Sequence, residues 1–220
     1  TCDFSKTEWQ PLDSAQLYTC DIFTQKIDSV DYKIKFEEHE SEIVEGLRFN
    51  ENENLNYLPE NIGDAFPNIL GLYAMKTYLT VINVNDLKGL KKLKYLNLAN
   101  TDLKAIDEGV FSDLEELVEL DLSDSDIQHI NENAFQGLKA LKSLFLGANK
   151  LSQLEAKTFN PLVSLESISL ELNHLVEIDD NLFAMTTKLA DIWLNGNKII
   201  AMNWQAIENI KSLGYIDVQN

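Results

Sequence analysis

The stretch LKYLNLANTDLKAIDEGVFSDLEE, residues 93–116, decides the fold, because the chain repeats its pattern. Six leucines stand 24 residues apart, at Leu93, Leu117, Leu141, Leu165, Leu189 and Leu213. Apolar residues recur in the same way three, five, ten, thirteen and eighteen positions after most of these leucines. A fixed period of this length predicts a solenoid, in which one small unit is stacked many times.

Two looser copies of the unit precede this series, one beginning at Val44 and one at Ile69. We therefore expect residues 44–220 to hold about seven full repeats and a truncated eighth. Residues 1–43 lie outside the period and are expected to form an N-terminal cap. Each unit of a solenoid contacts only its neighbours, which predicts one elongated domain.

The pattern LxxLxLxxNxL followed by xxLxxxxFxxL resembles the leucine-rich-repeat family, over roughly residues 44–220. The resemblance implies an α/β solenoid in the form of a horseshoe. Its concave face would be a parallel sheet, and its convex face would carry short helices or 3₁₀ turns. Alternation along the LxL segment independently predicts a short strand in each repeat.

Eight residues after the first leucine, this family carries an asparagine that bonds to backbone groups of the turn after each strand. Here the column reads Thr77, Thr101, Ser125, Asn149, Asn173 and Asn197. A hydroxyl has one donor hydrogen where an amide has two. We expect the hydroxyl half of the column to be less fully hydrogen-bonded, and the whole column to be structural.

The formal net charge of −18 limits the choice of partners. Nucleic acids and anionic membrane surfaces are disfavoured, because binding them needs clustered lysine and arginine. The charge serves either solubility or the attraction of a basic partner. The longest apolar runs fall short of the ~18 residues that a membrane span needs.

Both cysteines, Cys2 and Cys20, lie near the N-terminus. They are either free thiols of a cytosolic protein or a disulfide. Because both fall in the segment that must cover the first repeat, we favour a disulfide, which would contribute about 3 kcal/mol. A secreted or extracellular location would follow from it.

The cap departs from the usual four-cysteine start of extracellular leucine-rich-repeat proteins. The segments Tyr18–Ile22, Val44–Phe49 and Phe66–Asn68, with Ile27, Phe36 and Leu58-Pro59 between them, look like the cap of secreted insect members. Mosquito immune members, which assist a complement-like thioester protein, have a similar start. They also carry a coiled coil and further cysteines, which nothing in this chain matches. The resemblance implies only the Cys2–Cys20 disulfide and a concave docking surface.

Catalytic and metal-binding patterns are not found in the sequence. The three histidines, His39, His129 and His174, occupy unrelated positions, and we expect the last two in loops. The acidic pairs Asp124/Asp126 and Asp179/Asp180 lack the spacing, glycine and terminal glutamate of a calcium loop. We expect no enzyme, no cofactor and no metal.

The side chains that alternate outward on the concave strands remain unexplained by folding. They combine aromatic residues with carboxylates, which are typical of interface anchors and of electrostatic steering. The alternative is that large residues merely shield the sheet. The predicted partner-binding residues are Tyr73, Tyr95, Asn97, Glu119, Asp121, Phe145, Glu171, Asp191, Trp193, Tyr215 and Asp217.

These observations favour a secreted recognition module, in innate immunity, that binds a protein with a basic or amphipathic segment. One alternative is an adhesion or receptor ectodomain trimmed from a membrane-anchored protein. Another is a structural homodimer through the last repeat, where Leu213, Ile216 and Val218 would be covered on one side only. We expect either that the native chain continues past residue 220 or that this end meets a partner copy.

Overall fold

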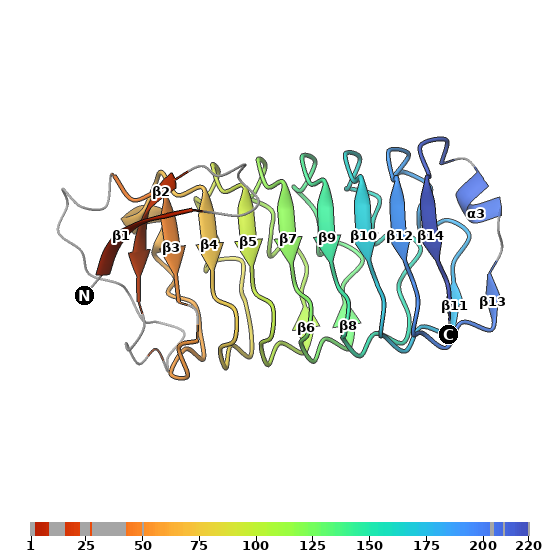
Figure 1. Ribbon diagram of the computed structural model, residues 1–220, viewed down its shortest axis with the longest axis horizontal. Coiled ribbons are helices and arrows are strands. Elements are labelled where there is room, and N and C mark those ends of the chain that lie inside the picture. Colours follow the sequence, from red (N-terminus) through yellow and green to blue (C-terminus); the bar gives the residue numbers. More distant parts are fainter. Residues whose placement is uncertain are drawn as a thin grey trace.

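The computed structural model describes residues 3–8, 16–22, 27, 43–49, 51–202, 205–208 and 210–219. The chain winds into a row of similar coils that runs from left to right in Figure 1, and each coil adds one strand to a continuous sheet. The sheet has ten strands in the order β1-β2-β3-β4-β5-β7-β9-β10-β12-β14. All neighbours from β2 onward are parallel, as the 24-residue period predicts.

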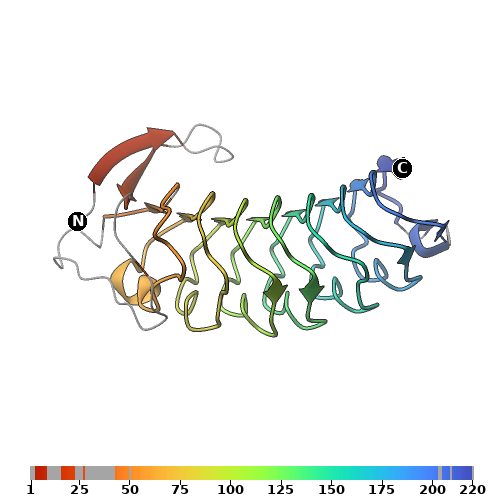
Figure 2. The ribbon, with the colours of Figure 1, turned by 90° about the horizontal axis from the view of Figure 1, so that it is seen from below.

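The eight coil strands are short, and each begins two residues after the first apolar position of its repeat. They are β3 (Gly46–Arg48), β4 (Gly71–Tyr73), β5 (Tyr95–Asn97), β7 (Glu119–Asp121), β9 (Ser143–Phe145), β10 (Ser167–Ser169), β12 (Asp191–Trp193) and β14 (Tyr215–Asp217). Seen edge-on, they line the inner side of a shallow arc (Figure 2). The seven repeats and the partial eighth therefore appear at the expected positions.

The N-terminal segment continues this sheet. Strands β1 (Asp3–Glu8) and β2 (Gln16–Asp21) form an antiparallel hairpin, and β2 pairs in parallel with β3. Cys20 is buried, whereas Cys2 and the alternating run 32–36 lie outside the described residues. The Cys2–Cys20 disulfide therefore stays a prediction.

The core runs the length of the coil as stacked columns of apolar side chains. Leu96, Leu120 and Leu144 are all at most 1% exposed, and each stacks on its neighbour one repeat away. On the turn side, phenylalanine rings follow one another at centroid distances of 6.1, 5.9 and 5.9 Å, in the series Phe111, Phe135, Phe159 and Phe183. The coil thus buries a continuous core although no single repeat has one.

The convex side differs from the expected short helices or 3₁₀ turns. Among the described residues its regular elements are two four-residue helices, α2 (Ile62–Ala65) and α3 (Gln205–Glu208), and four two-residue strands. These strands are β6 (Ala105–Ile106), β8 (His129–Ile130), β11 (Glu177–Ile178) and β13 (Ala201–Met202), paired as β6–β8 and β11–β13. The α/β label was therefore wrong for most repeats, because so short a return segment does not recover the cost of helix nucleation. His129, expected in a loop, lies in β8.

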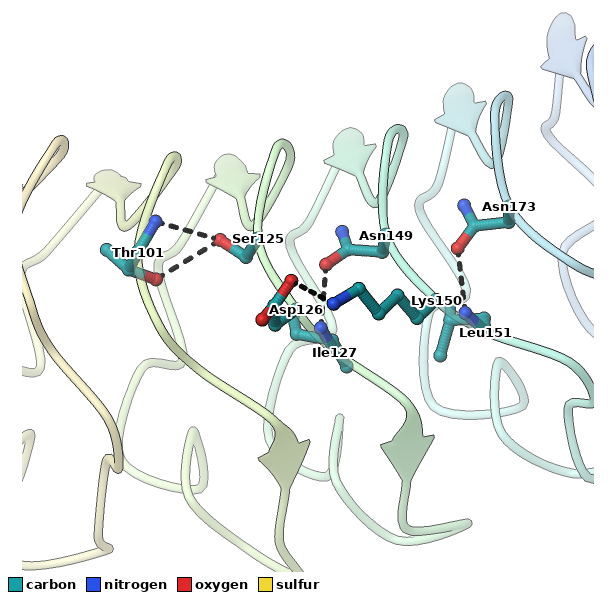
Figure 3. A network of polar contacts seen from close by, with 8 residues as sticks. All are labelled: Thr101, Ser125, Asp126, Ile127, Asn149, Lys150, Leu151 and Asn173. Atoms are coloured by element: carbon teal, nitrogen blue, oxygen red, sulfur yellow. Dashed lines mark hydrogen bonds and ion pairs between the residues drawn. The ribbon is translucent and has the colours of Figure 1, made fainter.

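The asparagines of this column form hydrogen bonds with backbone groups of the turns, as expected. Asn149 Nδ2 donates to the carbonyl oxygens of Leu122 and Leu146 at 2.9 and 3.1 Å, and its Oδ1 accepts from Ile127 N at 3.0 Å. Thr101 Oγ1 donates to Leu98 O at 3.0 Å, and Thr101 N donates to Ser125 Oγ at 3.1 Å. Figure 3 shows the change from hydroxyls to amides along the coil. The hydroxyls reach fewer backbone groups, which confirms the prediction.

Candidate functional site

The outward side chains of the concave strands form two rows, because alternate residues of a strand point to the same face. Parallel pairing sets the members of each row one strand apart. The first row contains Tyr95, Glu119, Ser143, Ser167, Asp191 and Tyr215. The second contains Arg48, Tyr73, Asn97, Asp121, Phe145, Ser169, Trp193 and Asp217.

The structure thus brings the predicted partner-binding residues onto one face, with Glu171 two residues after the end of β10. Most of these side chains are half-buried, and Tyr215 is 47% exposed. Ser169 of the second row is buried. The rings of Trp193 and Tyr215 pack against each other with centroids 6.1 Å apart. The placement is as predicted, while the binding role of these residues stays a prediction.

The face is electrostatically negative in its middle. Burial and the neighbouring Asp121 carboxylate raise the pKa of Glu119. Burial, followed by the charges of Glu119 and Asp121, raises the pKa of Tyr73 to about 12. Arg48 is the basic residue of the two rows, and its Nε and Nη2 donate to Asp21 Oδ1 and Oδ2 at 2.5 and 2.6 Å. The guanidinium is therefore paired with a carboxylate of the cap.

A hollow of about 360 Å³ opens on this face over β7, β9 and β10. Its floor is made of small residues, and the Glu171 side chain lies across Gly147 and accepts a hydrogen bond from Ser169 Oγ. The hollow is lined by Glu119, Asp121, Ser123, Asp124, Phe145, Gly147, Ala148, Ser169, Glu171 and Leu172. Four of these were already candidates from sequence: Glu119, Asp121, Phe145 and Glu171.

Sequence reasoning missed Leu172, which is 58% exposed and borders the hollow. It belongs to a column of residues with positive φ that turn the chain after each strand. The column contains Lys76, Asn100, Asp124, Ala148, Leu172 and Gly196, with φ between 51° and 69°. A leucine is unusual in this conformation, where glycine, asparagine and aspartate are favoured. The sequence feature that could have pointed to Leu172 is its position in this column, which repeats every 24 residues.

A second hollow, of about 350 Å³, lies on the flank beyond the ends of β4, β5 and β7. It is polar and includes Tyr78, Asp102 and both residues of the Asp124/Asp126 pair. Lys150 Nζ contacts Asp126 Oδ1 at 2.6 Å, so this carboxylate has an internal counter-charge (Figure 3). Among the described residues, groups of three or more histidine, cysteine or acidic side chains placed to hold a metal ion are absent.

Within the described residues there is also no helix long and apolar enough to cross a membrane.

Residues 72–127 and 115–175 match the family described as Leucine rich repeat. Among the curated proteins, none matches this chain.

Two solved structures resemble the coil. The crystal structure of the TLR13–ssRNA13 complex is 27% identical, with a TM-score of 0.76 over 80% of this chain and 25% of that chain. The Toll–Spatzle complex of Drosophila is 24% identical, with a TM-score of 0.72 over 76% and 22% of the two chains, and supports the fold alone. This chain therefore spans about a quarter of the length of the chains that it matches.

Proposed function

Because residues 72–175 are leucine-rich repeats, and the same coil continues on both sides of them, we propose that this chain is a secreted recognition module. It binds a protein ligand through the concave face. The observation that carries this proposal is the pair of rows that combine aromatic side chains with carboxylates on a half-buried sheet surface. Aromatic residues are the usual anchors of protein interfaces, and carboxylates steer basic partners.

The structural likeness supports ligand binding but not a particular ligand. The similar structure at 27% identity is a complex with RNA, so it lends no support to our expectation that this chain avoids nucleic acids. That expectation rests on the net charge of −18 and stays a prediction. A role in innate immunity is proposed from the resemblance of the cap to insect immune proteins.

Secretion rests on the Cys2–Cys20 disulfide, which belongs to the proposal. Mass spectrometry of a proteolytic digest prepared without reductant should recover the two cysteines in one linked fragment. Two separately alkylated cysteines in the protein isolated from its natural source would remove this support for an extracellular location.

The concave site is tested by replacing three of its aromatic residues together. Trp193→Ala, Phe145→Ala and Tyr95→Ala should abolish capture of the ligand from the fluid that bathes this protein. The melting temperature should move by only a few degrees, because the three side chains are half-buried and outside the core. Capture should weaken at high salt, since exposed charges are screened.

A matched control carries three substitutions among exposed apolar residues away from the concave strands: Val84→Ser, Val163→Ser and Met185→Ser. This variant should capture the ligand like the unchanged protein. If the concave variant still captures the ligand, or the control loses it, the concave site is wrong.

A second candidate is part of an adhesion or receptor ectodomain. It is favoured by the length of the similar solved chains, of which this chain spans about a quarter. A transcript that continues past residue 220 into an apolar segment of about 20 residues would decide for it. The concave ligand site is common to both candidates.

A further inference from the structure

We propose that the concave hollow over β7, β9 and β10 is the docking place for an arginine side chain of the protein ligand. This inference rests on the proposed function, because it names the chemistry that part of the same face recognises. Three features of the hollow support it: its charge, its two large apolar side chains and its shape.

The charge of the hollow is unbalanced. Asp121 accepts hydrogen bonds from Asn97 Nδ2 and from Ser123 N, at 3.1 and 3.0 Å, and Glu171 accepts one from Ser169. All of these donors are neutral. In the part of the chain that the structure describes, the ion pairs join other residues, and none includes Glu119, Asp121 or Glu171. A cationic side chain would therefore meet carboxylates whose charge nothing offsets.

Two of the side chains that line the hollow, Phe145 and Leu172, are large and apolar. Phe145 stands on β9 between the carboxylates of β7 and the end of β10, and Leu172 forms the rim. The exposure of Leu172 is unexplained by the core, and its positive φ of 54° adds a conformational cost. A guanidinium can stack on an aromatic ring while its methylene stem covers an aliphatic neighbour.

The shape of the hollow depends on Gly147. A methyl group at this position would stand 2.5 Å from Glu171 Oε1, so the glycine leaves room for the carboxylate to lie across the floor. Carboxylates thus border the space from β7 on one side and from the turn after β10 on the other. A guanidinium has five donor hydrogens in a planar fork, against three on a lysine ammonium. Arginine is therefore the better match.

The probe is the tripeptide Leu-Arg-Leu-amide with fluorescein on its amino group, and its binding is followed by fluorescence anisotropy. Two companions replace arginine by lysine or by citrulline, which has nearly the same shape without the charge. The arginine peptide should bind saturably, and the lysine peptide should bind more weakly. The citrulline peptide should bind at least about tenfold more weakly than the arginine peptide, because it loses a charged contact. Equal binding of the arginine and citrulline peptides, or no saturable binding of the arginine peptide, overturns the proposal.

Two variants locate the site. Glu119→Gln with Glu171→Gln removes two charges at constant shape, and Gly147→Ala intrudes on the floor at constant charge. Each variant should weaken the binding of the arginine peptide about tenfold or more, while its melting temperature stays within a few degrees of that of the unchanged protein. The control, Glu115→Gln with Glu116→Gln, removes two exposed charges from the turn that precedes β7 and should leave binding unchanged. An equal loss in the control would show unspecific attraction and overturn the proposal.

The same variants separate this inference from the proposed function. If the aromatic triple variant loses the natural ligand while the Glu119→Gln, Glu171→Gln variant keeps it, the concave site stands and the arginine subsite is wrong. If both keep the ligand, the concave site itself is wrong.

Discussion

Asp86 is a buried carboxyl on the turn side of the coil, only 3% exposed. Its Oδ2 accepts a hydrogen bond from Asn83 N at 2.7 Å, but burial outweighs this bond and, with a smaller contribution from Glu60, raises the pKa to about 6. The unfolded chain loses this proton near the ordinary value of 3.8, whereas the folded chain keeps it to about pH 6. Stability should therefore fall as the pH rises from 4 to 6.

Asp86→Asn removes the charge and keeps an oxygen for Asn83 N. We expect the free energy of unfolding to increase by about 1–3 kcal/mol at pH 7 and to change much less at about pH 3, below the pKa of Asp86 in both the folded and the unfolded chain. Urea denaturation at the two pH values measures both quantities. The same gain at both would contradict the titration of Asp86.

Leu172 and Gly196 occupy equivalent places one repeat apart, with φ of 54° and 69°. Leu172→Gly relieves a left-handed leucine, so we expect it to stabilise the fold by about 1 kcal/mol after the entropy cost of glycine. Gly196→Ala should destabilise, because its methyl group would stand 2.7 Å from Leu172 Cδ2 in a strained conformation. Thermal unfolding compares the two. A stabilised Leu172→Gly that binds the arginine peptide more weakly would connect the strain with function.

At the scale of elements, an ion pair lies at the junction between the cap and the first repeat, beside the backbone pairing of β2 with β3. Arg48 of β3 and Asp21 of β2 face each other in register and form a two-point ion pair, with side chains 26% and 7% exposed. Asp21→Ala leaves the guanidinium unpaired and should cost about 2–4 kcal/mol, whereas Asp21→Ala with Arg48→Ala should cost less than the sum of the single changes. A double-mutant cycle by urea denaturation measures the coupling, and additive costs would show that the pair is not coupled.

The elements also show which features the sequence could predict. The concave rows follow from strict alternation and a fixed period, so Tyr95, Glu119 and Trp193 were found without a structure. The hollow was not, because it depends on how Glu171 lies over Gly147, which no periodic pattern encodes. The convex helices were over-predicted from the family resemblance. In these repeats the phenylalanine column and the backbone bonds between neighbouring coils already hold the return segment.

At the scale of the whole molecule, stability is a sum over neighbouring coils, since each repeat contacts only the next. The bonds from Val118 N to Lys94 O and from Lys142 N to Val118 O, both 2.8 Å, show this nearest-neighbour connection. A defect in the middle of the coil should therefore act differently from one near its end. Phe135 and Phe183 are equally buried members of one column, at 0% and 1% exposure, and allow a matched comparison.

Phe135→Ala and Phe183→Ala should each cost about 3–5 kcal/mol locally, from lost burial and the cavity left behind. Because Phe135 packs against rings on both sides, its loss should separate the coil into two parts that open independently. Native-state hydrogen exchange should then show two levels of protection that meet near β9. Phe183→Ala should instead lower protection from β12 onward and leave β3 to β7 unchanged. A uniform loss of protection in both variants would mean that the coil unfolds as one cooperative unit, and the nearest-neighbour description would be wrong.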